Sequence, residues 1–183
     1  EPSMRWQRFA DEILDLADDY EVPMLITMGA LLADTPHSRP ISVTGSGAHP
    51  DVAEKLGVEI SRYEGPTGIV GVLQDTAHRR GLDAVSLWAA VPHYVSTPPS
   101  PKASLALVNA LEDFLEISIT QGDLPERAAS WERQVDQMAA EDSEVGDYVR
   151  QLESSKDASD LPDVTGEAIA REVERFLRRN PEI

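Results

Sequence analysis

One segment constrains the fold of this sequence more than any other: the run from Ala84 to Val91 is apolar almost throughout. Because the run does not alternate between apolar and polar residues, it predicts a strand that is covered on both faces. Strands of this kind are typical of layered α/β proteins, in which helices cover a mainly parallel sheet. The sequence therefore predicts an α/β fold with this segment as a central strand.

Helical and extended patterns alternate around this segment. Apolar residues three and four positions apart indicate helices, and short apolar runs bounded by Gly or Pro indicate strands. The expected strands are 22–28, 41–44, 84–91 and a poorer one at 59–63. The expected helices are 6–20, 51–56, one that opens at 65–68 and runs to Arg80, and 101–115. This alternation with short loops favours a mainly parallel sheet with helices on its faces.

From Asp123 onward the pattern is helical only, so we expect an α/β domain over 1–122 and an acidic helical region over 123–183. The first part of that region reads as one helix, or as two helices kinked around 141–144. The polar segment 154–162 predicts a linker, and 164–179 predicts a final helix. Few strands are visible and residue 1 is Glu, so we expect the first strands of the sheet to precede this numbering.

The charge balance limits the classes of molecule that this chain can bind. The chain carries 33 acidic and 16 basic residues, a net charge of −17, which disfavours nucleic acid and anionic membranes. The charge divides nearly evenly, as −9 over 1–122 and −8 over 123–183. The absence of cysteine excludes disulfides and thiol chemistry, and no apolar run is long enough for a membrane span. We expect a cytoplasmic protein.

Two loops carry candidate catalytic residues, at predicted strand ends where α/β proteins place their sites. His37 and Arg39 lie in the loop between the strands 22–28 and 41–44, and His93 and Tyr94 follow the central strand. If the protein is an enzyme, these residues would provide a proton carrier and an anion contact. The favoured interpretation is structural, because such sets more often tie a loop to itself or line an interface.

A third loop, with Gly65, Thr67 and Gly68, opens a predicted helix and could bind an anion at the helix N-terminus. It has neither the lysine of a phosphate-binding loop nor complete dinucleotide-binding spacing, which favours a structural turn capped by Thr67. The four histidines have no metal-ligand spacing, so neither a metal nor a cofactor is expected.

The helical region has a continuous apolar stripe at helical spacing. We predict that this stripe is a core or interface seam rather than a cofactor site. The residues expected at an interface are Trp131, Val135, Met138, Val149 and Leu152.

A series of short motifs resembles one protein family in its order and spacing. The motifs are Glu1-Pro2 with Trp6, Pro36-His37-Ser38-Arg39-Pro40, Tyr63-Glu64-Gly65-Pro66-Thr67-Gly68-Ile69, Leu87-Trp88-Ala89-Ala90-Val91-Pro92-His93-Tyr94, Ser100-Pro101 and Leu152-Glu153. Together they are similar to the actinobacterial branch of the proteasome assembly chaperone family. The resemblance covers about residues 1–153.

The resemblance implies a three-layer α/β/α fold of the phosphorylase/hydrolase-like group, self-association as a homo-oligomer such as a trimer, and no established catalysis. It also implies proteasome subunits as partners, although the chaperone members use a C-terminal hydrophobic-Tyr-any residue tail and this sequence ends Asn180-Pro181-Glu182-Ile183. We therefore expect a non-enzymatic oligomeric scaffold or assembly-chaperone-like protein. The alternative is a phosphorylase- or hydrolase-like enzyme that binds a small anionic ligand near the strand-end loops.

Overall fold

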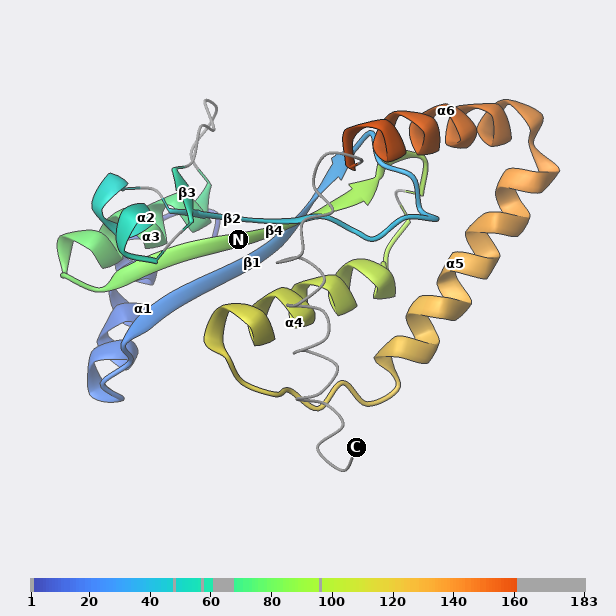
Figure 1. Cartoon of the computed structure of the whole chain (residues 1–183). Coiled ribbons are helices and arrows are strands. Elements are labelled where there is room, and N and C mark those ends of the chain that lie inside the picture. Colours follow the sequence, from blue (N-terminus) through green and yellow to red (C-terminus); the bar gives the residue numbers. More distant parts are fainter. Residues whose placement is uncertain (1, 48, 57, 61–67, 96, 161–183) are drawn as a thin grey trace. The chain divides into compact units, whose positions relative to one another are not determined.

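The computed structural model describes residues 2–47, 49–56, 58–60, 68–95 and 97–160 (Figure 1). Within these ranges the chain is a mixed α/β protein. Its helices are α1 (Trp6–Asp19), α2 (Pro50–Leu56), α3 (Ile69–Arg79), the short 3-10 turn η1 (His93–Val95), α4 (Pro101–Leu115), α5 (Leu124–Glu141) and α6 (Ser143–Asp160). Its strands are β1 (Met24–Ala33), β2 (Val43–Gly47), β3 (Glu59–Ile60) and β4 (Asp83–Pro92).

The strand β4 is central in the sheet, as its apolar sequence predicts. The strand order is β1-β4-β2-β3, which gives β4 a hydrogen-bonded neighbour on each side. Seven of its ten residues are buried and the other three are half-buried. The strands β2 and β3 run parallel, with Ser46 opposite Glu59 and Gly47 opposite Ile60. The expected α/β class is thus confirmed for the described residues.

The chain divides into two compact units that interleave along the sequence. Unit 1 comprises residues 1–29 and 44–88, and unit 2 comprises residues 30–43 and 89–183. The strands β1 and β4 therefore contribute their first residues to unit 1 and their last residues to unit 2. Neither unit is a continuous stretch of chain.

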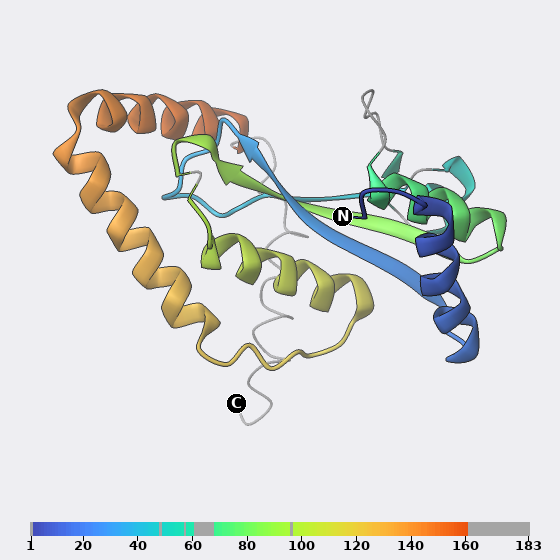
Figure 2. The same cartoon turned by 180° about the vertical axis from the view of Figure 1, so that it is seen from behind.

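In unit 1, α1 packs against α3 (Figure 2). Leu14 of α1 and Ala77 of α3 are fully buried in one apolar cluster with Ala84 of β4. On the outer side, the Arg80 guanidinium binds the carboxylates of Asp11 and Asp15, with nitrogen to oxygen distances of 2.8 and 2.7 Å. These contacts fix which face of α1 turns toward the sheet.

The close approach of β1 and β4 in unit 1 depends on a glycine. A Cβ atom placed on Gly29 would lie 2.5 Å from Cζ3 of Trp88, closer than carbon atoms can approach. Near this contact a buried polar chain joins three elements. Gln74 of α3 donates to Ser86 Oγ at 2.6 Å, and Ser86 Oγ lies 2.7 Å from Thr27 Oγ1 of β1.

Unit 2 has its own apolar cluster, formed by Ile41, Ala89, Val91 and Ala103. The helix α4 packs against α5, and α5 packs against α6; Figure 1 draws the last two in orange and red. The α5 helix ends at Glu141 and α6 begins at Ser143, which confirms the two-helix alternative. Asp142 caps the second helix, since its Oδ1 accepts the Glu144 backbone N–H at 2.9 Å.

Several element boundaries differ from the expected ones. Strand β1 continues beyond the predicted end at residue 28 to Ala33, and β2 runs over 43–47 rather than 41–44. The α6 helix continues through Asp160, so 154–160 is helical where a linker was expected. Two polar residues of that segment, Lys156 and Asp157, contact the loop before β2. Gly81 follows α3 with φ +80°, as expected of a glycine at a helix end. Residues 61–63 and 164–179, expected as strand and helix, lie outside the described residues.

Candidate functional site

The side chain of His37 is at the centre of the candidate site and is almost completely buried, with 1% of its surface exposed. It lies in the loop 34–42, between β1 and β2. Its Nδ1 and its backbone nitrogen each lie 2.8 Å from the phenolic oxygen of Tyr94, on η1. Its Nε2 lies 3.0 Å from Oδ1 of Asp136, on α5. His37 therefore joins the loop to the end of the central strand and to a helix about 100 residues away.

We assign one arrangement of hydrogen atoms to these contacts. An ionised Asp136 only accepts hydrogen bonds, so Nε2 of His37 carries a hydrogen and donates it. In the neutral imidazole Nδ1 is then an acceptor, and the Tyr94 hydroxyl donates to it. The same Tyr94 oxygen accepts the backbone N–H of His37. The backbone N–H and both ring nitrogens of His37 thus have partners.

Burial moves the pKa of the Tyr94 hydroxyl further above neutral pH. Desolvation raises the pKa of Tyr94 to about 12, although the hydrogen bond from the backbone of His37 opposes the shift. The nearby carboxylate of Glu153 raises it further. Because this pKa is far above neutral pH, Tyr94 remains a donor to His37 under physiological conditions.

The two residues after His37 connect the same loop to α6. Ser38 donates a hydrogen bond to Glu153. Arg39 binds Asp157 with two parallel contacts, from Nε to Oδ1 and from Nη2 to Oδ2, both 2.7 Å long. The hydrogen bond from Arg39 lowers the pKa of Asp157. Paired guanidinium-carboxylate contacts of this kind fix orientation as well as distance.

The helix α4 holds the loop from another side. Nζ of Lys102 donates to the backbone carbonyl of His37, and it forms an ion pair of 2.6 Å with Glu132 of α5. Only 15% of the Lys102 side chain is exposed. One lysine thus links the loop, α4 and α5 at the point where His37 is buried.

His93 lies beside this cluster but nearer to solvent. Its Nδ1 is 3.2 Å from Oδ1 of Asp34, and 44% of its side chain is exposed. The hydroxyl of Tyr148 donates to the same Asp34 oxygen at 3.2 Å. The rings of His93, Tyr94 and Tyr148 meet edge to face, with centroids 5.3 to 6.0 Å apart. The structure thus brings His37, His93 and Tyr94 together, while Arg39 points to α6.

This arrangement is suited to a structural role, in which side-chain contacts hold the loop 34–42 in place. A general base must reach a proton on its substrate, directly or through one water. Both ring nitrogens of His37 are already bonded within the protein, and its side chain is almost inaccessible. We use the name His37 clasp for His37, Tyr94, Lys102 and Asp136. Sequence reasoning identified His37 and Tyr94, but it missed Lys102 and Asp136, because neither belongs to a local motif.

The predicted anion-binding turn is described only in part. Gly65 and Thr67 lie outside the described residues. Gly68 precedes α3 with an extended backbone, at φ −93° and ψ −179°. Among the described residues, no group of three or more His, Asp or Glu side chains is arranged to hold a metal ion. None of the helices in the described ranges is both long and apolar enough to cross a membrane.

The predicted interface seam lies on α5 and α6 and is largely buried within this one chain. Trp131 and Val135 of α5 keep 8% and 4% of their surface exposed, and Val149 and Leu152 of α6 keep 6% and 9%. Met138 is the exception, with 38% exposed. In this chain, four of the five residues therefore pack inside unit 2.

A different apolar surface faces solvent on α1. The side chains of Phe9, Ile13, Leu16 and Tyr20 share one face at helical spacing and are 37%, 36%, 53% and 79% exposed. These are residues whose spacing indicated the helix, whereas the buried ones are Ala10 and Leu14. We call this face the α1 stripe. Sequence reasoning detected the stripe but gave no sign that it is exposed.

Comparison with known sequences identifies the family. The sequence model of the PAC2 family matches residues 1–139. The chain belongs to the PAC2 family. No curated protein matches the sequence.

Solved structures of PAC2 proteins are similar in both sequence and fold. A PAC2 family protein from Streptomyces avermitilis is 54% identical with a TM-score of 0.74, and the match covers 81% of this chain and 63% of that one. A proteasome-assembly chaperone homologue from Mycobacterium tuberculosis is 48% identical with a TM-score of 0.70 over the same shares.

A more distant structure shares the fold alone. PbaA from Pyrococcus furiosus, an archaeal homologue of proteasome-assembly chaperone, is 23% identical with a TM-score of 0.56, and the match covers 85% of this chain and 65% of that one. The chain thus spans less than two thirds of the length of these three PAC2-like structures.

Proposed function

We propose that this chain acts as a non-enzymatic, assembly-chaperone-like protein that binds other protein subunits. Its similarity to the Mycobacterium tuberculosis proteasome-assembly chaperone homologue, at 48% identity, carries the proposal. The His37 clasp supports it, since His37, one of the candidate general bases, is engaged in holding unit 2 together. Proteasome subunits are the partner class that the relatives' names suggest, and copies of the chain itself are the second.

The α1 stripe is the surface that we assign to the partner. Four large apolar side chains on one helix face favour a protein contact, because water leaves such a surface readily. The helix beneath is held by Leu14 in the core and by the ion pairs of Arg80. A partner would therefore meet a surface that is already ordered, which reduces the entropic cost of binding.

Two further features belong to this proposal. We infer a three-layer arrangement of the phosphorylase/hydrolase-like kind, in which helices cover both faces of the sheet. It is supported by β4, which has no exposed residue. We also infer that the protein works in the cytoplasm, the place where proteasome subunits would be met.

Binding to purified Mycobacterium tuberculosis proteasome subunits tests the proposal. The full chain is compared with a Leu16→Glu/Tyr20→Ser variant by size-exclusion chromatography with light scattering. Gln7→Glu is the matched control, because it adds a charge to the same helix outside the α1 stripe. We expect the wild type and the control to form a complex and the double variant to lose at least tenfold in affinity. A wild-type chain that binds neither the subunits nor itself would refute the proposal.

A further inference from the structure

The α1 stripe has the spacing of a coiled-coil seam. Its residues Phe9, Ile13, Leu16 and Tyr20 follow one another at intervals of four, three and four positions, and Trp6 precedes Phe9 by three. Apolar residues at such alternating intervals recur about every 3.5 residues, which is the repeat at which one helix packs along another. The stripe and Trp6 therefore form a seam that fits a second helix aligned with α1.

The packing of unit 1 leaves most of this seam uncovered. The helix α1 meets α3 through Leu14, which is fully buried beside Ala77 and does not belong to the seam. Leu16 and Tyr20 of the seam are 53% and 79% exposed. Removing large apolar side chains from water is favourable, so a second helix would be stabilised here.

Charges of opposite sign lie at the two ends of α1. Arg5 is the N-cap and Asp19 is the last residue of the helix, and both are exposed. Within the part of the chain that the structure describes, neither side chain forms an ion pair. Glu12 lies between them and pairs with Arg8 at 2.8 Å. Because Arg5, Glu12 and Asp19 recur every seven residues, they share one flank of the seam.

An antiparallel copy of α1 complements the seam. When Phe9 lies opposite Ile13 of the second copy, Trp6 lies opposite Leu16, and the two-fold axis between the copies repeats each pair. The helix has 14 residues and is about 21 Å long, so this register uses most of its length.

The same register brings the flanking charges together. Arg5 of one copy and Asp19 of the other are offset by about 3 Å along the helix axis, so an ion pair can form at each end of the contact. Glu12 faces Glu12 of the second copy, and each is neutralised by its own Arg8. A parallel copy would place Arg5 at the level of Arg5 and Asp19 at the level of Asp19. The charges therefore favour a second copy in the antiparallel direction.

The net charge of the chain does not prevent this contact. Each copy carries −17, which opposes association at long range. Salt at physiological concentration screens charges that are more than about 8 Å apart, whereas the groups at the contact act at shorter distances. Local complementarity therefore decides which surfaces meet.

We propose that two copies of this chain pair through antiparallel α1 helices and cover the α1 stripe when no other partner is bound. A surface that contacts its own copy closes at two chains. One part of this inference rests on the proposed function: a proteasome subunit that binds the stripe has to displace the second copy. Dimerisation and subunit binding then compete for the same side chains.

Disulfide trapping between single-cysteine chains tests the direction of the helices, because the native sequence has no cysteine. A Phe9→Cys chain is mixed with an Ile13→Cys chain. In the antiparallel register the mixed disulfide should form at least tenfold faster than either disulfide between identical chains. The matched control mixes Gln7→Cys, outside the seam, with Ile13→Cys and should react slowly.

Two results of this trapping would overturn the proposal. Faster disulfides between identical chains would show that the helices run parallel. Rates equal to that of the Gln7→Cys control would show that the seam makes no contact between copies.

Exchanging the end charges tests the ion pairs without changing the net charge. Arg5→Asp and Asp19→Arg should each raise the Kd of the dimer at least threefold, because each places like charges together at both ends of the contact. The double variant restores opposite charges, so its Kd should return to within about twofold of wild type. Sedimentation velocity over a concentration series at physiological salt measures each Kd. A double variant as weak as the single ones would overturn the antiparallel register.

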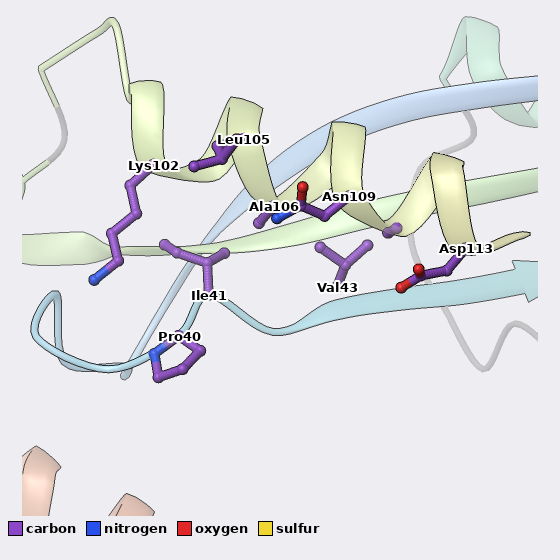
Figure 3. Close-up of a pocket in the computed structure, with 9 residues that line it drawn as sticks. Pro40, Ile41, Val43, Lys102, Leu105, Ala106, Asn109 and Asp113 are labelled. Carbon is purple, nitrogen blue, oxygen red and sulfur yellow. The ribbon is translucent and has the colours of Figure 1, made fainter. Parts of the chain in front are cut away.

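A groove in unit 2 provides a matched control surface. It has a volume of about 380 Å³ and lies between the face of α4 and the residues Pro40, Ile41 and Val43 (Figure 3). Leu105 lines this groove and is half-buried. We expect Leu105→Glu to leave the dimer intact and Leu16→Glu to remove it, with circular dichroism used to check that both variants fold. The opposite pattern would assign the contact to unit 2 and overturn the proposal.

The pairing and the proposed function fail in different ways. A chain that stays monomeric throughout the concentration series yet binds the proteasome subunits would overturn the pairing and leave the proposed function in place. A chain that pairs through α1 but binds no subunit would support the pairing and contradict the proteasome part of the proposed function. Where both hold, adding subunits should convert the dimer into a complex with one copy of the chain.

Discussion

The phenolic oxygen of Tyr94 lies 2.8 Å from two nitrogens of His37, the backbone N and the ring Nδ1. It accepts a hydrogen bond from the first and donates one to the second, so a single hydroxyl satisfies both groups. Only 1% of the His37 side chain is exposed, so water could not replace this hydroxyl as the partner of the backbone N–H and the imidazole ring. One hydroxyl group is thus among the contacts that hold the loop 34–42 in place.

Removing this hydroxyl should destabilise the protein without changing its shape. Tyr94→Phe leaves the His37 backbone N–H and Nδ1 without their partner, which we expect to lower the free energy of unfolding by about 1–3 kcal/mol. Urea denaturation followed by circular dichroism measures the loss. Tyr148→Phe is the control, because its hydroxyl binds Asp34 at an exposed position, and its loss should stay within about 0.5 kcal/mol. Equal losses in the two variants would contradict the clasp.

The pair formed by Arg39 and Asp157 should make stability depend on pH at acidic values. The hydrogen bond from Arg39 lowers the pKa of Asp157 below its ordinary value of 3.8. Stability from such a pair is complete above the unfolded-state pKa and is lost as the pH falls through the lower folded-state pKa. We expect the free energy of unfolding to decrease below about pH 4, and less steeply in Asp157→Asn.

Urea denaturation at a series of pH values measures this slope. Arg39→Gln is the matched variant, since it removes the partner of the same carboxylate; because Arg39 also lies 3.5 Å from Glu153, it should flatten the slope at least as much. If the slopes of wild type and Asp157→Asn coincide, the ion pair contributes nothing to stability. The contrast should weaken in high salt, because both side chains are partly exposed.

Replacing Trp131 should lower the folding stability of the single chain, and any weaker association should follow from that loss. Its side chain is 8% exposed within a single chain, so Trp131→Ala removes a buried aromatic group and should cost about 3–5 kcal/mol of folding free energy. Met138→Ala on the same helix is the control, because Met138 is 38% exposed, and its cost should be about 1 kcal/mol or less. Thermal unfolding and sedimentation velocity on the same samples separate the two effects. Weaker association with unchanged stability would show that Trp131 belongs to an interface.

The close contact of Gly29 with Trp88 predicts that the stability losses caused by substituting these two residues depend on each other. Gly29→Ala would place a methyl carbon 2.5 Å from Cζ3 of Trp88, and we expect the displaced ring to cost about 1–3 kcal/mol. Trp88→Leu removes the obstructing ring. The double variant should therefore lose less stability than the two single losses combined, which a double-mutant cycle measures by urea denaturation. Strict additivity would contradict the close contact.

Much of the fold could be predicted from local sequence. The central position of β4 follows from its continuous apolar run, because only a strand with neighbours on both faces and both edges can bury such a run. The end of α3 follows from Gly81, whose positive φ suits few other residues. Both signals lie within a few residues of the structure that they determine.

The orientation of α1 could not be predicted in the same way. Its largest apolar residues form the α1 stripe, yet the face turned to the core carries Ala10 and Leu14. The ion pairs from Arg80 to Asp11 and Asp15 hold the helix in this orientation. Periodicity gives the existence of a helix, whereas these contacts are made by a residue more than 60 positions away.

The partners of His37 and Lys102 on α5 escaped prediction for a related reason. The motif around His37 marked the loop as chemically rich, but Asp136 and Glu132 are two acidic residues among many on α5. Only the fold selects them, by placing them opposite His37 and Lys102. The segment 154–160 was expected as a linker because it is polar. It is helical, and Asp157 contacts Arg39.

The sequence separation within these contacts has a consequence for synthesis of the protein. Arg39 and Asp157 are 118 residues apart, and His37 and Asp136 are 99 apart. At roughly 5–20 residues per second, a ribosome needs on the order of 6–24 s to make the chain between Arg39 and its partner. During that interval the imidazole of His37, which is buried in the folded protein, and the guanidinium of Arg39, which is paired there, are both exposed to solvent. The loop 34–42 is thus made early and reaches its final place only when α6 emerges.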